Sequence, residues 1–160
     1  MSIKFGGAAL FSFVLFSAPL RAELPAELTR LDEGAPKAYI TRVGSLPHSV
    51  IAALRTVRGL SEFHMADVGG DWNLTDSVTD SSLPFRRLIW AVGFKGYVVV
   101  HYEVGGYGHS YHVIVLSPEG PDGARSVVWA AGSFERANDY SEFVAAYRRG
   151  KMNSDARIIH

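Results

Sequence analysis

Residues 97–116 of this chain read YVVVHYEVGGYGHSYHVIVL. Two runs rich in β-branched and aromatic residues flank a cluster of glycines, a pattern that predicts a β-hairpin. A loop of two or four residues at these glycines places His101 opposite His112 on the paired strands. Glu103 then lies on the same face as both histidines, one pleat further along.

The sequence on both sides of this hairpin predicts two more strands. The expected strands cover residues 88–94, 97–104, 109–116 and 125–131, with a tight turn at Lys95-Gly96 and a longer one at 118–123. Sequential strands that are joined by short turns pair with their neighbours in antiparallel order. We therefore expect a four-stranded antiparallel meander.

Two principal helices are expected, one before the strands and one after them. The first opens at Leu46-Pro47, because proline is tolerated in the first turn of a helix. The second opens at Asp139, which has capping-box spacing to Glu142. We expect both helices to cover the face that carries Val100 and Val113. The predicted fold is thus α+β, a four-stranded antiparallel meander sheet packed on one face by two principal helices.

The first 22 residues have the pattern of a secretory signal peptide. Lys4 provides a positive start, residues 6–20 carry no charge, and Ala22 offers a small residue at the cleavage site. Cleavage after Ala18 is the alternative. The apolar run is too short for a comfortable membrane span of about 20 residues.

Residues 23–160 are expected to form a single exported domain, periplasmic or secreted, with no stable membrane span after removal of the signal. The chain has no cysteine, so this domain has to fold on its hydrophobic core alone. Sixteen basic and sixteen acidic residues cancel, and no basic patch is present. We therefore expect no nucleic-acid partner.

The sheet face opposite the expected helices is both aromatic and polar. Together with the glycine loop it provides a candidate binding face of Trp90, His101, Glu103, Tyr107, His112 and Trp129. In one interpretation the row that Trp90, His101, His112 and Trp129 form across the four strands is structural, since aromatic cross-strand pairs stabilise sheets. In another it binds a partner, because Trp and Tyr are frequent anchors at interfaces.

Metal binding and catalysis have less support in the sequence. His101 and His112 are the candidate metal ligands, but a catalytic zinc site usually has three protein ligands and a structural one four. We expect no metal and no cofactor. His101 with Glu103 is a candidate acid–base pair, but the sequence has no nucleophile elbow, no HExxH helix and no phosphate loop.

Two functions follow as hypotheses. The first is an exported small binding module that acts on a protein partner, as an inhibitor, an immunity factor or an accessory subunit does. The second is a metal-dependent or histidine-dependent hydrolase that uses the His101/His112 face. The first is favoured, so the chain is not expected to be an enzyme.

The export hypothesis predicts that the mature protein begins at Glu23. The physical reason is the charged, apolar and small-residue order of the first 22 residues, which signal peptidases recognise. Intact-mass measurement of protein from the exported fraction checks this. Protein that still carries Met1 in that fraction would contradict it.

Overall fold

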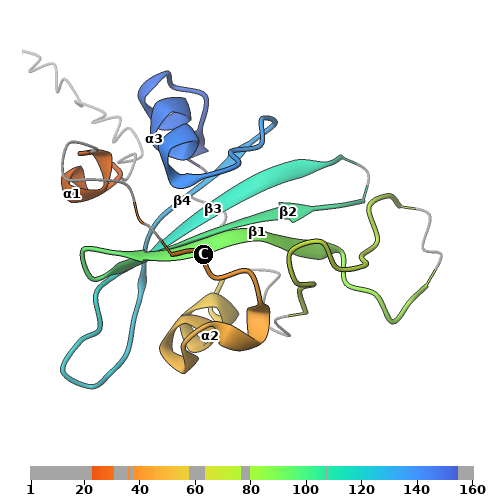
Figure 1. The fold of residues 1–160 in the computed structure, drawn as a ribbon, viewed down its shortest axis with the longest axis horizontal. Coiled ribbons are helices and arrows are strands. Elements are labelled where there is room, and N and C mark those ends of the chain that lie inside the picture. The colour runs from red at the N-terminus through yellow and green to blue at the C-terminus, as the bar shows by residue number, and fades with distance from the viewer. Residues whose placement is uncertain are drawn as a thin grey trace, which may run out of the picture.

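Figure 1 shows the computed structural model, which describes residues 23–30, 36, 38–57, 64–76, 80–106 and 108–154. The strands are β1 (Arg86–Phe94), β2 (Tyr97–Val104), β3 (Ser110–Leu116), β4 (Val127–Ser133) and β5 (Asn153–Ser154). They form one antiparallel sheet in the order β1-β2-β3-β4-β5. The predicted meander and the α+β class are confirmed, and the short β5 extends the sheet beyond β4.

The turn between β1 and β2 is the two-residue turn that the sequence predicts. Phe94 pairs with Tyr97, and the two residues between them, Lys95 and Gly96, have φ values of 51° and 85°. Two successive positive φ values are the mark of a type I′ turn, whose twist matches that of the flanking strands.

The hairpin between β2 and β3 differs from the prediction by one residue. Its loop contains five residues, 105–109, so that Val104 pairs with Ser110 and His101 pairs with Val113. The predicted pairing of His101 with His112 is therefore wrong. A one-residue change of register moves every side chain of one strand to the other face relative to its partner.

The glycines of this loop explain the difference. The N–H of Gly105 donates to the carbonyl of Phe85, and the N–H of Gly106 donates to the carbonyl of Leu74. A Cβ atom on Gly105 would lie 2.3 Å from the carbonyl oxygen of Asn73. Gly105 is thus required by the close approach of a neighbouring segment, and not by a tight turn.

The helices lie on both faces of the sheet. They are α1 (Ala26–Thr29), α2 (His48–Arg55) and α3 (Tyr140–Arg148), with a 3-10 turn at Val43–Ser45. Figure 1 shows α1 and α3 on one side of the sheet and α2 on the other. The predicted packing of both principal helices on one face is wrong. The reason is that consecutive residues of β2 are apolar, so both faces of the sheet need cover.

Two separate cores result, one under each layer of helices. On the α1/α3 side the buried strand residues include Trp90, Val92, Val99, Val113, Val115 and Trp129. On the α2 side they include Leu88, Ala91, Val98, Val100, Ile114 and Ala130. Val100 and Val113 are both buried, as predicted, but in different cores.

A β-bulge at Ile89 adjusts the faces of β1. Leu88 pairs with Tyr102, whereas Trp90 pairs with His101. Ile89 is the additional residue, so Ile89 and Trp90 both contribute to the α1/α3 core. The bulge brings the start of β1 into line with the end of β2, where the functional candidates lie.

Asp139 caps α3 as the spacing predicts, but Glu142 bonds back to Asn138, the residue before the N-cap, so the capping box is only partly formed. Asp139 Oδ1 accepts from the N–H of Glu142 at 2.8 Å, and Glu142 Oε2 accepts from the N–H of Asn138 at 2.7 Å. Within the described residues, no helix combines the length and the apolar character needed to cross a bilayer.

Candidate functional site

The two histidines of the predicted row lie on opposite faces of the sheet. His101 belongs to the α1/α3 face, where its ring centroid lies 5.2 Å from that of Trp90. His112 pairs with Tyr102 and stacks on its ring, with centroids 5.3 Å apart and planes 20° from parallel. The two imidazoles cannot share a metal ion, so the metal candidates of the sequence are wrong as a pair.

His101 is held as a neutral structural side chain. Its Nδ1 lies 2.9 Å from the carbonyl oxygen of His112, and its Nε2 accepts from the N–H of Ala137 at 3.3 Å. The carbonyl only accepts, so the hydrogen is on Nδ1. Burial lowers the pKa of His101 to about 4, against the opposing effect of the bond to His112 and with a smaller contribution from Arg136.

The two tryptophans of the predicted face are core residues. Trp90 is buried and donates from Nε1 to the carbonyl of Ala137 at 2.9 Å. Trp129 is also buried, opposite Val115 on β3 and packed against Phe143 of α3. The structure therefore separates them from any surface that could bind a partner. The remaining candidate, Tyr107, lies outside the described residues.

Of the predicted site residues, Glu103 is the one that the structure supports, although its neighbours differ from those expected. It pairs with Arg87 across β1 and β2, and only 2% of its side chain is exposed. Arg87 Nε lies 2.7 Å from Oε1, and His109 Nε2 lies 2.7 Å from Oε2. A buried carboxylate needs such partners, because an unpaired buried charge is strongly unfavourable.

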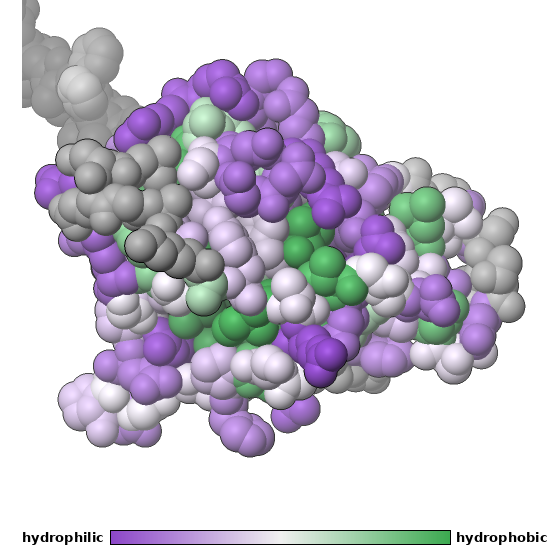
Figure 2. All heavy atoms as spheres, in the orientation of Figure 1, coloured by the Kyte–Doolittle hydropathy of each residue, from purple (hydrophilic) through white to green (hydrophobic). Residues whose placement is uncertain are grey.

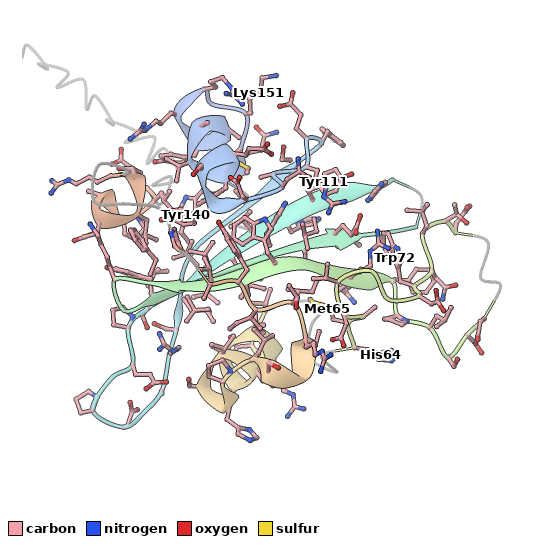
Figure 3. All side chains as sticks on the ribbon, viewed as in Figure 1. His64, Met65, Trp72, Tyr111, Tyr140 and Lys151 are labelled. Carbon is pink, nitrogen blue, oxygen red and sulfur yellow. The ribbon has the colours of Figure 1, made fainter. Side chains whose placement is uncertain are left out.

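Two aromatic rings complete this arrangement. The ring of Trp72 lies 4.9 Å from Arg87 Cζ and 5.6 Å from the ring of His109. The ring of Tyr111 also contacts that of His109, with centroids 4.8 Å apart. Figure 3 shows Trp72 and Tyr111 at the same end of the sheet, beyond α3. We refer to Trp72, Arg87, Glu103, His109 and Tyr111 as the hairpin-end cluster.

The segment that carries Trp72 is tied to the residues just before β1 by a buried asparagine. Asn73 Nδ2 donates to the carbonyls of Asp80 and Leu83 at 2.8 and 2.9 Å, and its N–H donates to the carbonyl of Pro84. A bridge between Thr75 and Gly106 joins the same segment to the β2–β3 loop. The ring of Trp72 is therefore held in position over Arg87.

Large apolar side chains are exposed around the cluster. Phe134 is 83% exposed, and it directly follows Ser133, the partner of Tyr111 in the sheet. Leu74 and Phe85 are exposed as well, in the two segments that bond to Gly105 and Gly106. Figure 2 shows apolar residues among polar ones over residues 64–76 and 80–85, at the right of the view.

Sequence reasoning identified Glu103 but missed Arg87, His109 and Trp72 as its neighbours. Arg87 was missed because its pairing with Glu103 depends on the bulge at Ile89. Trp72 comes from an irregular segment whose position no local pattern reports. Among the described residues, no three His, Asp or Glu side chains come close enough to hold a metal ion together.

Comparison with known proteins adds no relative. No model of a known protein family matches the chain, and neither a curated protein nor a solved structure shows significant similarity to it. The functional interpretation rests on the geometry of the chain itself.

The structural role of His101 predicts a specific pH dependence of stability. The folded-state pKa of about 4 lies below the ordinary value of 6.5, so the unfolded chain binds the proton first as the pH falls. Stability contributed by the neutral ring is complete above pH 6.5 and is lost progressively down to pH 4. The loss amounts to about 3 kcal/mol.

Urea denaturation of the parent and of His101→Gln at pH 7 and pH 4 measures this contribution. We expect the difference in unfolding free energy between the two proteins to shrink by about 3 kcal/mol at the lower pH. Between pH 7 and pH 8 the difference should stay constant. A difference that is the same at pH 7 and pH 4 would show that His101 is not buried as a neutral ring.

Proposed function

We propose that this protein is an exported binding module that acts on a protein partner through the hairpin-end cluster. The observation that carries the proposal is the convergence of Trp72, Arg87 and Tyr111 on one partly exposed surface. Trp, Tyr and Arg are the residue types that dominate the energetics of protein interfaces.

The arginine of the cluster is preorganised for binding. Arg87 is held from one side by the carboxylate of Glu103 and from another by the ring of Trp72. A long flexible side chain loses rotamer freedom when a partner immobilises it, at a cost of about 0.5–1.5 kcal/mol. Because Arg87 is already fixed, most of this cost falls on folding and not on association.

The exposed apolar residues beside the cluster support the same proposal. Phe134, Leu74 and Phe85 keep large apolar surfaces in water. Burial of one such side chain in an interface yields about 1.5–3 kcal/mol. An aromatic residue as exposed as Phe134 is therefore a natural anchor for a partner, and the polar cluster supplies orientation.

The alternative, a histidine-dependent hydrolase, has a weaker basis. Glu103 orients His109 much as a carboxylate orients a catalytic base. However, among the described residues His109 makes no hydrogen bond to a hydroxyl that it could activate as a nucleophile. Export of the mature chain remains part of the proposal. It is tested by the intact mass of the exported protein, which shows at which residue the mature chain begins.

Site-specific photo-crosslinking tests the binding surface. A photoreactive phenylalanine analogue at position 134 should capture one protein from the exported fraction, identified by mass spectrometry of the adduct. The same analogue at Arg55, which is exposed on α2 across the sheet, is the positional control. Trp72→Ala should reduce the adduct about tenfold or more, since loss of an interface anchor costs about 2 kcal/mol.

The matched control for the substitution is His48→Ala, an exposed position at the start of α2. It should leave the adduct unchanged. Equal capture from positions 134 and 55, or an adduct that survives Trp72→Ala at full yield, would contradict a binding surface at the hairpin end.

A further inference from the structure

The carboxylate of Glu103 determines the tautomer of His109. Oε2 of Glu103 only accepts, so the hydrogen of the neutral imidazole is on Nε2, 2.7 Å away. Nδ1 is then a hydrogen-bond acceptor. No other described residue makes a hydrogen bond to this ring, and 37% of the side chain is exposed. His109 therefore presents an open acceptor at the surface.

Arg87 presents open donors on the other side of the same carboxylate. Only Nε is used, in the bond to Glu103 Oε1, and the terminal amino groups make no hydrogen bond to any other described residue. Trp72 covers the face of the guanidinium, which leaves the donors in its plane accessible. The side chain is 26% exposed.

The charge of the cluster restricts what can bind there. The positive charge of Arg87 and the negative charge of Glu103 compensate each other when His109 is neutral. Glu103 is 2% exposed and both of its oxygens are bonded, so the groups that reach a ligand are the donors of Arg87 and the acceptor Nδ1 of His109. Because Glu103 already compensates the charge of Arg87, an uncharged group that offers one acceptor and one donor matches both.

We propose that Arg87 and His109 together bind the backbone of an extended segment of the partner protein. Arg87 donates to a carbonyl oxygen of that segment, and Nδ1 of His109 accepts from an amide N–H. An extended strand presents the N–H and the C=O of one residue on the same side, which matches a donor and an acceptor that flank one carboxylate. This inference rests on the proposed function and specifies the partner's chemistry at the same surface.

The substitution His109→Gln isolates the acceptor. A glutamine amide nitrogen can replace Nε2 as the donor to Glu103, which keeps the buried carboxylate paired. The acceptor that glutamine retains, its amide oxygen, branches from Cδ and does not reproduce the position and direction of Nδ1. His109→Gln should therefore fold like the parent and bind about tenfold more weakly, the effect of one lost hydrogen bond of about 1.4 kcal/mol.

The probe is a library of random linear peptides displayed on phage, selected against the mature protein. We expect selected peptides that are uncharged at their centre and that bind about tenfold more weakly to His109→Gln. Methylation of single backbone nitrogens in a selected peptide should weaken binding at one position in the parent. That same methylation should cause no additional loss in His109→Gln.

The protonation state of His109 provides a second readout. Protonation converts Nδ1 from an acceptor into a donor, so binding should weaken when the ¹⁵N resonances of the ring show that it has become charged. The charged groups that face His109 from the described elements are Glu103 and Arg87, with Trp72 and Tyr111 packed against its ring.

Two results would overturn the inference and leave the proposed function intact. One is binding that Trp72→Ala abolishes but His109→Gln and backbone methylation leave unchanged. The other is selection of acidic peptides that bind more tightly once His109 is protonated. Binding that neither Trp72→Ala nor His109→Gln affects would remove both the inference and the proposed surface.

Discussion

The buried carboxylate of Glu103 is the constraint around which this end of the molecule is organised. It is the only acidic side chain that is buried among the described residues. A charge removed from water must be paired and hydrogen-bonded, or the fold loses several kcal/mol. Arg87 supplies one partner across the sheet, and His109 supplies the other from the far side of the hairpin loop. Both contacts of Glu103 depend on the position of the loop and on the alignment of β1 with β2.

The two ends of the sheet consequently differ in character. Under α3 the α1/α3 face is aromatic and closed, with Trp90 and Trp129 buried against Phe143. Beyond α3 the same face becomes polar and partly open, and Trp72 reaches over it from an irregular segment. His101 lies at the boundary, and its two hydrogen bonds tie β2 to β3 and to the chain before α3. The closed, aromatic half of the sheet thus adjoins the half that carries the hairpin-end cluster.

Local signals in the sequence were sufficient for the strands, for the tight turn at Lys95-Gly96 and for the helix N-cap at Asp139. Each depends on residues within a few positions of one another. The register of β2 and β3 was not accessible in this way, because Gly105 is required by Asn73, more than thirty positions earlier in the chain. The distribution of the helices was missed because both faces of β2 are apolar, and the sequence does not say which helix covers which face.

The residues of the candidate site show the same difference between local and long-range signals. Glu103 was identified because a charged residue stood out in an apolar strand. Trp90 and Trp129 were misassigned because aromatic residues on a sheet can belong to a core as well as to an interface. Only the position of α3 over them shows that they belong to the core. Arg87 and Trp72 reach Glu103 through a bulge and an irregular segment, and neither feature has a reliable sequence pattern. The hairpin-end cluster is therefore recognisable only in the three-dimensional arrangement.

The site depends most on the register of β2 and β3, because this register separates the two histidines and brings His109 to Glu103. Nuclear Overhauser contacts between aromatic side chains test it most directly. The account predicts cross-peaks from the His101 ring to the rings of Trp90 and Tyr111, and from the His112 ring to that of Tyr102. A direct cross-peak between the rings of His101 and His112 would contradict the register and, with it, the site.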